Sequence, residues 1–209
     1  MIEKLIAGYR CFRSGYYEEN SERLIELAQK GQSPKVAVIA CSDSRIDPAV
    51  ITQSAPGELF VVRNVANLVP PCVEEGIWHG TSAALQFAVC NLQVEHIIVL
   101  GHAKCGGINA LLKPSPVEAN KGFIKSWMSV ADKARQQVLS RSDLQSFEEQ
   151  CYACEHESIK ASLLNLQTFP WIAEAIEHGK LELHGWHYDL EACTLSSLDA
   201  VTETFRPIE

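Results

Sequence analysis

The sequence lacks an excess of positive charge. Its 209 residues carry 18 lysine and arginine side chains against 26 aspartate and glutamate side chains, and the formal net charge is -8 at pH 7. Nucleic acids and anionic membrane surfaces are bound through clustered lysine and arginine. We therefore expect neither as a partner, and we expect a small-molecule substrate.

A long hydrophobic run is also missing. No stretch approaches the roughly 18 apolar residues that a membrane-spanning helix requires. The first residues, MIEKLIAGYR, contain neither the continuous apolar segment nor the small-residue cleavage site of a signal peptide. We therefore expect no membrane association and a cytoplasmic location.

Internal repeats, linkers and low-complexity segments are absent as well. The composition, with 46% apolar and 21% charged residues, is that of a folded globular protein. We predict a single domain over residues 1–209, in which residues 1–30 form an arm of two helices. This arm either packs on a neighbouring subunit or covers the sheet of its own chain.

Eight cysteines are present. In a chain of this size without an export signal, metal binding or burial as reduced thiols is more common than disulfide formation. Cys151 and Cys154 form a C-x-x-C pair, but we place them one turn apart in a helix and assign them to core packing.

Short apolar runs alternate with helical patterns from residue 35 onward. The runs at 35–40, 59–63, 96–100 and 181–188 predict strands, and the segments between them have the apolar spacing of helices. Strands that alternate with helices are typical of α/β folds. We predict a central, largely parallel sheet flanked by helices, with a mostly helical second half.

Two of the predicted strands end at possible metal ligands. One apolar run leads to Cys41, and another leads to His102 and, three residues later, Cys105. Parallel strands bring their carboxyl ends to one edge of the sheet, where such folds bind ligands. Two thiolates and one imidazole form a three-ligand set for zinc, and a fourth position left open for water is typical of catalytic zinc.

Asp43 and Arg45 follow the first of these ligands at intervals of two residues. The Asp43 carboxylate can reach the metal or accept a hydrogen bond from its bound water, and Arg45 can hold that carboxylate bidentately. Two thiolates make zinc a weaker Lewis acid than three neutral ligands, so the water needs such help. Two alternatives stay open: Asp43 closes the site by occupying the fourth position, or the pair only ties down the loop.

Three motifs together resemble those of the β-class carbonic anhydrases, which are zinc enzymes that interconvert CO2 and bicarbonate. The motifs are CSDSR at 41–45, VRNVANLVPP at 62–71 and GHAKCGG at 101–107. The resemblance implies zinc on Cys41, His102 and Cys105, and it implies that Asp43 and Arg45 orient a zinc-bound hydroxide that attacks CO2. It further implies a homodimer or a larger even oligomer, with active sites near the subunit interface and N-terminal helices reaching over the partner.

Val38 distinguishes two branches of that family. The branch that is inhibited by bicarbonate has tryptophan three residues before the first cysteine, where this chain has Val38. The resemblance is instead to the plant-like branch, whose zinc keeps its fourth position open. We therefore predict a zinc site without the bicarbonate-dependent regulation.

The resemblance to the plant-like branch also implies a substrate pocket. It gives Gln32 and the backbone N–H of Gly106 as hydrogen-bond donors to substrate oxygens, and it gives Phe60 and Val65 as apolar pocket residues. Phe87 stands where that branch usually has tyrosine, so the phenolic hydroxyl is missing. We place Phe60, Val65 and Phe87 in a dry slot for CO2 beside the metal.

Our predicted reaction is the reversible hydration of CO2 to bicarbonate and a proton. A hydrolase of COS or CS2 on the same scaffold is one alternative, because these linear molecules resemble CO2 in shape. A non-catalytic, zinc-stabilised module that binds bicarbonate is another. Asp43, Arg45 and Gln32 speak against this second alternative, because a purely structural zinc site needs none of them.

Overall fold

The computed structural model of the chain describes residues 1–73, 79–113 and 122–208. It divides into two compact units, Met1–Ser33 and Pro34–Glu209. No helix within the described ranges combines the length and the hydrophobicity that crossing a bilayer would require. The sequence predicts that Pro114 and Pro116 end a helix that starts near Gly106, and both prolines lie outside the described residues.

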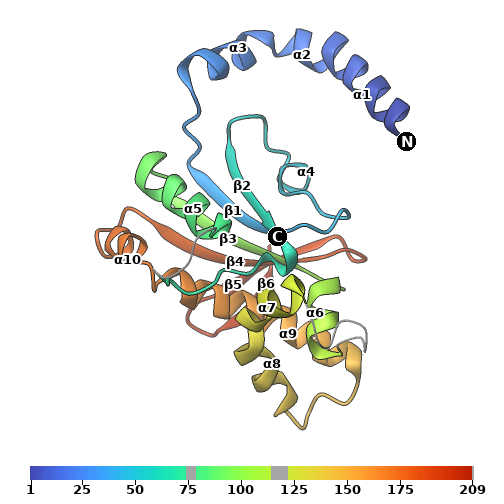
Figure 1. Cartoon of the computed structure of the whole chain (residues 1–209), viewed down its shortest axis with the longest axis vertical. Coiled ribbons are helices and arrows are strands. Elements are labelled where there is room, and N and C mark those ends of the chain that lie inside the picture. Colours follow the sequence, from blue (N-terminus) through green and yellow to red (C-terminus); the bar gives the residue numbers. More distant parts are fainter. Residues whose placement is uncertain (74–78, 114–121, 209) are drawn as a thin grey trace. The chain divides into compact units, whose positions relative to one another are not determined.

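The first unit has three helical segments in place of the two predicted (Figure 1). They are α1 (Ile2–Ser14), α2 (Tyr16–Glu19) and α3 (Ser21–Lys30). Gly15 and Asn20 interrupt the helical pattern, and none of the three segments has a buried residue. The apolar side chains of Ile2, Leu5 and Tyr9 are 67%, 63% and 60% exposed in the single chain.

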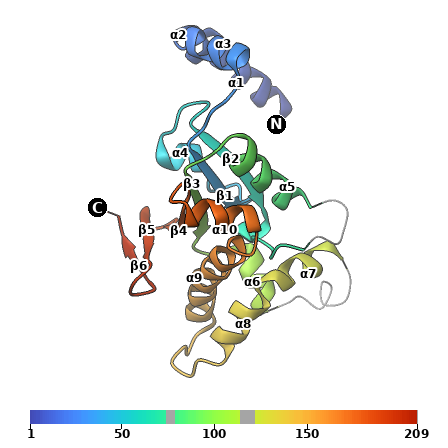
Figure 2. The ribbon, with the colours of Figure 1, turned by 90° about the vertical axis from the view of Figure 1, so that its left-hand side faces the viewer.

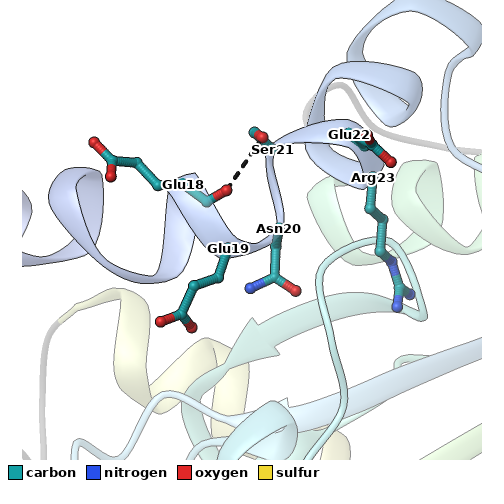
Figure 3. A pocket seen from close by; sticks show the side chains of 6 residues that line it. All are labelled: Glu18, Glu19, Asn20, Ser21, Glu22 and Arg23. Carbon is teal, nitrogen blue, oxygen red and sulfur yellow. Dashed lines mark hydrogen bonds between the residues drawn. The ribbon is translucent and has the colours of Figure 1, made fainter.

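A surface pocket of the first unit lies where α2 is followed by α3 (Figure 3). It is lined by six consecutive residues, Glu18, Glu19, Asn20, Ser21, Glu22 and Arg23. The Ser21 hydroxyl donates a hydrogen bond to the carbonyl oxygen of Glu18 at 3.2 Å. The pocket is polar, and it contains none of the predicted site residues.

A six-stranded sheet forms the centre of the second unit (Figure 1). Its strands are β1 (Val36–Cys41), β2 (Leu59–Asn64), β3 (His96–His102), β4 (Glu182–Asp189), β5 (Thr194–Asp199) and β6 (Thr204–Pro207). Their order is β2-β1-β3-β4-β5-β6. The pairs β2–β1, β1–β3 and β3–β4 are parallel, and the pairs β4–β5 and β5–β6 are antiparallel. The predicted α/β fold with a largely parallel sheet is confirmed.

Helices bury one face of this sheet (Figure 2). The helical segments of the unit are α4 (Pro48–Thr52), η1 (Val65–Asn67), α5 (Gly80–Gln86), η2 (Phe87–Asn91), α6 (Gly106–Leu112), α7 (Phe123–Met128), η3 (Ser129–Ala131), α8 (Asp132–Leu139), α9 (Phe147–Leu166) and α10 (Pro170–Glu177). Ile39 of β1 and Val99 of β3 lie in one fully buried cluster, to which α5, α9 and α10 contribute Leu85, Ile159 and Ile172. Each such side chain contributes about 1.5–3 kcal/mol through burial, so this layer fixes the strands that carry the site.

On the opposite face of the sheet, the buried cluster is made of strand residues alone. Val38 and Leu100 lie in a separate buried cluster, with Trp186 of β4 and Leu195 of β5 packed against it. These residues all belong to strands. The alternation of Val38 with Ile39, on neighbouring positions of β1, places each on a different face, as the pleat of a strand requires.

From residue type, the sequence predicts Ser142 or Asp143 as the cap of one helix and Thr81 or Ser82 as the cap of another, and both helices start elsewhere. Helix α9 begins after Ser146, because Ser146 forms a capping box with Glu149. The Ser146 hydroxyl accepts from the Glu149 N–H at 3.1 Å, and the Glu149 carboxylate accepts from the Ser146 N–H at 2.8 Å. Helix α5 begins at Gly80, and the hydroxyl of Thr81, a predicted cap, contacts the Asn64 side-chain amide at 3.3 Å instead.

Strands β5 and β6 were not predicted. Their sequences, TLSSLD and TFRP, are short and rich in polar residues, so they lack a clear strand pattern. The connection between them is closed by Asp199, whose carboxylate accepts from the N–H groups of Val201 and Thr202 at 2.9 Å. Such aspartate turns allow the chain to reverse, and the hairpin extends the sheet.

Candidate metal centre

Cys41, His102 and Cys105 meet at the carboxyl end of the sheet. Cys41 ends β1, His102 ends the neighbouring strand β3, and Cys105 is the N-cap of α6. The possible ligand atoms of the three side chains all lie within 4.8 Å of one another. The residues are 5%, 0% and 1% exposed. Two strand ends and one helix start therefore bring these three predicted residues together in the interior.

The two sulfur atoms are spaced for a shared ion and not for a disulfide. Cys41 Sγ and Cys105 Sγ are 4.0 Å apart, and both cysteines are free. A disulfide requires about 2.05 Å. Tetrahedral zinc with two bonds of about 2.3 Å places its sulfur ligands roughly 3.8 Å apart. The observed separation fits the second case.

His102 presents an unpartnered ring nitrogen in this cluster. Its Nδ1 lies 2.9 Å from the carbonyl oxygen of Ala103, so we assign the proton to Nδ1 and a lone pair to Nε2. Nε2 is buried and has no hydrogen-bond partner among the described residues. Such a nitrogen is costly to leave buried and unbound, and a metal ion would satisfy it.

The contact between the two thiols shifts their pKa values in opposite directions. The hydrogen bond with Cys105 lowers the pKa of Cys41 to about 4. The same contact, together with burial, raises the pKa of Cys105 far above its ordinary value. The shared hydrogen bond therefore favours the thiolate at Cys41 and the thiol at Cys105. A divalent ion bound between the sulfur atoms would offset the negative charges of two thiolates. Both thiols can then be deprotonated, as thiols that coordinate a metal are.

The segment after β2 supports the first sulfur. Ala66 adopts a left-handed conformation with φ of 63° and ψ of 25°, and its N–H donates to Cys41 Sγ at 3.4 Å. A Cβ at Gly107 would lie 3.0 Å from both Ala66 Cβ and Val65 Cγ1. Any side chain at Gly107 would therefore push this segment away from the cluster.

Asp43 lies beside the cluster and is held by Arg45. Arg45 Nε donates to Asp43 Oδ1 at 2.9 Å, Arg45 Nη2 donates to Oδ2 at 2.7 Å, and the Arg45 backbone N–H also donates to Oδ1 at 2.9 Å. These hydrogen bonds hold the pKa of Asp43 well below its ordinary value. Asp43 Oδ2 lies 3.9 Å from His102 Nε2. An ionised carboxylate is thus fixed at the edge of the cluster.

Arg63 holds the backbone beside the cluster, a role that the sequence did not predict. Its guanidinium donates to the carbonyl oxygens of Cys41 at 3.0 Å, Asp43 at 2.7 Å and Ile46 at 2.8 Å. Arg45 also donates to the carbonyl oxygen of Lys104 at 2.9 Å, which links this loop to the one that carries Cys105. Two arginines therefore fix the backbone around the site.

Glu155 and His187 lie behind Cys105, and the sequence did not predict a role for either residue. The Cys105 backbone N–H donates to Glu155 Oε1 at 3.1 Å, and His187 Nε2 lies 3.1 Å from Glu155 Oε2. Both side chains are only 3% exposed. Glu155 lies in a segment with the apolar spacing of a helix, where a glutamate is ordinarily expected to be solvent-exposed.

Only some of the predicted pocket residues lie near the three candidate ligands. Val65 packs in the buried cluster that includes Cys41 and Cys105, and Gly106 is the first residue of α6. Phe60 pairs with Ala37 in the sheet, so it lies roughly 13 Å before the carboxyl end of its strand.

A single chain therefore does not assemble the predicted slot of Phe60, Val65 and Phe87 beside the metal. The Phe60 and Phe87 rings contact each other, with centroids 6.0 Å apart, and Phe87 is 45% exposed. Gln32 belongs to the first unit. The substrate-binding roles of these residues stay predictions.

Known proteins with similar sequences include two from Arabidopsis thaliana. β-Carbonic anhydrase 5, chloroplastic, is 42% identical over 186 residues, and β-carbonic anhydrase 6, mitochondrial, is 45% identical over 185 residues. The matches cover 89% and 88% of this chain. The chain spans 61% and 63% of the lengths of these two relatives.

The names of these relatives correct the expected location. One is described as chloroplastic and the other as mitochondrial, so neither relative is named as a cytoplasmic protein. The prediction of a cytoplasmic location is therefore wrong. It rested on the absence of a signal-peptide pattern, and that absence does not distinguish the cytoplasm from an organelle.

Solved structures and a family model agree with these relatives. The β-carbonic anhydrase CcaA superposes with a TM-score of 0.93 at 35% identity, covering 100% of this chain and 92% of the other. A tetrameric β-carbonic anhydrase from Sordaria macrospora gives 0.82 at 27% identity, covering 95% and 97%. The family model described as carbonic anhydrase matches residues 36–195. The chain therefore belongs to the β-carbonic anhydrase family.

Proposed function

We propose that this protein catalyses the reversible hydration of CO2 to bicarbonate and a proton, with one zinc ion held by Cys41, His102 and Cys105. The observation that carries the proposal is the buried cluster of two thiols and one unpartnered imidazole nitrogen, with the Asp43–Arg45 pair beside it. Zinc bound there would act as a Lewis acid that lowers the pKa of a water molecule and so supplies a nucleophile near neutral pH.

Asp43 has the properties needed to orient that nucleophile. Its carboxylate is kept ionised by Arg45 and can only accept hydrogen bonds. Accepting the O–H of the attacking water at Oδ2 would direct an oxygen lone pair toward the carbon of CO2. Because Arg45 binds both carboxylate oxygens, we propose that Asp43 stays off the metal and that the fourth position remains open, as in the plant-like branch.

Backbone and apolar groups complete the proposed site. The first N–H groups of a helix have no intrahelical partner, so the Gly106 amide can donate to an oxygen of CO2 as negative charge develops on it. Val65 supplies an apolar wall next to the ligands. We assign Gln32, Phe60 and Phe87 to substrate binding across a subunit boundary, since Phe60 lies far along β2 from Cys41 of its own chain.

The stopped-flow rate of CO2 hydration tests the proposal directly. Purified protein with one zinc ion per chain should hydrate CO2 at alkaline pH, and removal of zinc should abolish the reaction. Turnover of COS or CS2 in preference to CO2 would contradict the proposal and would identify the protein as a hydrolase of these molecules. Zinc-loaded, folded protein that is inactive on all three would leave only the non-catalytic module.

A Glu155→Gln variant is expected to bind zinc about 10–100-fold more weakly, the usual effect of losing a hydrogen-bond partner behind a ligand. The Cys105 N–H donates to one Glu155 oxygen, and His187 Nε2 lies 3.1 Å from the other, so a glutamine amide can turn its oxygen toward only one of these groups. Competition with a chelator of known affinity measures the change. At saturating zinc the hydration rate should stay close to that of the unchanged protein.

Glu157→Gln is the matched control for that variant. Glu157 lies on the same helix, is partly buried and pairs with Lys160 at 2.9 Å. It should leave zinc affinity unchanged. Equal affinities in both variants would show that Glu155 does not support Cys105.

We further propose a homo-oligomer in which the arm packs on a neighbouring subunit. The tetrameric relative and the exposed apolar side chains of α1 support this arrangement. A Leu5→Glu and Tyr9→Glu double variant should have a smaller mass by light scattering than the unchanged protein. A Lys4→Glu variant, which alters charge on the same helix without removing apolar area, should not. A monomeric unchanged protein would contradict the proposal.

A further inference from the structure

His96, His184 and Glu182 form a cluster at the amino ends of β3 and β4. His96 is the first residue of β3 and pairs with Glu182, and Ile98 pairs with His184. Residues two apart on a strand point to the same face, so Glu182 and His184 lie on one side of β4. His96 and His102 are at opposite ends of β3, about 20 Å apart. The cluster is therefore separate from the candidate zinc site.

The three side chains are close enough to bind a single ion. His96 Nδ1 lies 3.1 Å from His184 Nε2 and 3.8 Å from Glu182 Oε2, and His184 Nε2 lies 3.9 Å from the same oxygen. Ligand atoms bound at about 2.0–2.2 Å around one metal are roughly 3–3.5 Å apart. The two nitrogens already satisfy this spacing. The Glu182 carboxylate needs to move by only a few tenths of an ångström.

The donors have the protonation states that a transition metal requires. Burial, followed by the neighbouring His96, lowers the pKa of His184, so its imidazole is neutral near pH 7. The short nitrogen–nitrogen contact also requires at least one unprotonated nitrogen. When a metal binds both nitrogens, a proton held in this contact moves to the other nitrogen of its own ring, so each imidazole presents a lone pair to the metal.

The surroundings are accessible and carry negative charge. The side chains of His96, His184 and Glu182 are 39%, 32% and 70% exposed, so an ion can enter from solvent. Glu95 adds a second carboxylate whose charge interacts with His96. Lys35 pairs with Glu95 at 2.5 Å and offsets the negative charge of Glu95. The negative charge of Glu182 is not offset by Lys35.

We propose that His96, His184 and Glu182 form a second metal site that takes a divalent transition-metal ion such as Zn2+, Ni2+ or Cu2+. Two imidazoles and a carboxylate favour these ions over Mg2+ and Ca2+, which prefer oxygen ligands. The ion links neighbouring strands at the end of the sheet opposite the catalytic centre. It binds more weakly than the buried zinc, because its ligands are partly exposed and include no thiolate.

Metal content at defined free zinc tests this site in the full-length protein. Equilibrium dialysis followed by mass spectrometry should find two zinc ions per chain in the unchanged protein and one in each of the His96→Gln and His184→Gln variants. Each variant should weaken the second binding step at least about tenfold, the smallest usual effect of losing even a supporting group. CO2 hydration at saturating zinc should not change. One zinc ion per chain in the unchanged protein would overturn the proposal.

A control variant and a spectrum distinguish this site from metal binding by any exposed histidine. His178→Gln removes another histidine, one whose Nδ1 lies 2.7 Å from the Glu174 carbonyl oxygen, and it should still bind two ions. Electron paramagnetic resonance of Cu2+ added to protein loaded with one equivalent of zinc, which fills the tighter thiolate site, should show coupling to two imidazole nitrogens, and to one in either variant. Loss of the second ion in His178→Gln, or identical spectra in all proteins, would contradict the assignment.

Discussion

A His102→Gln variant is expected to lose its zinc at the candidate site and, with it, essentially all CO2 hydration. Structural zinc sites contribute about 10–16 kcal/mol of binding free energy. If three ligands share such an amount, one of them contributes several kcal/mol, and its loss weakens binding by at least about a hundredfold. Zinc content after dialysis against a buffered zinc concentration, together with the stopped-flow rate, measures both effects.

His178→Gln also serves as the control here, because it replaces an exposed histidine outside the cluster. It should keep both the zinc and the activity. If His102→Gln kept one tightly bound ion at the candidate site and an unchanged rate, His102 would not be a ligand, and the orphaned Nε2 would need another explanation.

An Asp43→Asn variant is expected to retain zinc and its fold but to lower kcat/KM by about a hundredfold or more, the lower range for losing a group that handles a reacting proton. Asparagine keeps the shape of the side chain. It removes the charge that pairs with Arg45, and its amide N–H group cannot accept a hydrogen bond from water. The rate and the zinc content must be measured on the same preparation, so that a catalytic defect is distinguished from a loss of metal.

Asp47→Asn is the matched control for that prediction. Asp47 is a second carboxylate on the same loop, where it caps α4 by accepting from the Ala49 N–H at 3.0 Å, and asparagine is an equally good N-cap. Its rate should remain within a few-fold of the unchanged protein. Equal rates for Asp43→Asn and the unchanged protein would restrict Asp43 and Arg45 to holding the loop.

The sequence was sufficient to bring the three candidate ligands together. Cys41 and His102 each end a run of buried apolar residues, and parallel strands place such ends at one edge of a sheet. Asp43 and Arg45 are close in sequence, so their pairing depended on local geometry alone. Features of this kind follow from strand periodicity and short spacing, and they do not require knowledge of distant contacts.

Other parts of the molecule depend on contacts that no local pattern reveals. Glu155 reaches Cys105 only because α9 packs across the sheet, and His96 meets His184 only because β3 and β4 are neighbours. The polar strands β5 and β6 are fixed by pairing with β4 and by their turns. Strand register, which the sequence does not specify, places Phe60 beside Ala37, so the predicted slot of Phe60, Val65 and Phe87 stays a prediction for a site shared between subunits.

Zinc K-edge X-ray absorption on protein loaded with one equivalent of zinc is the most direct test of the central claim. We predict two sulfur ligands at about 2.3 Å, one imidazole nitrogen at about 2.0–2.1 Å and one oxygen at about 2.0 Å, with the oxygen retained in Asp43→Asn. A shell without sulfur would contradict the assignment of Cys41 and Cys105. Loss of the oxygen in Asp43→Asn would show that the carboxylate, and not water, fills the fourth position.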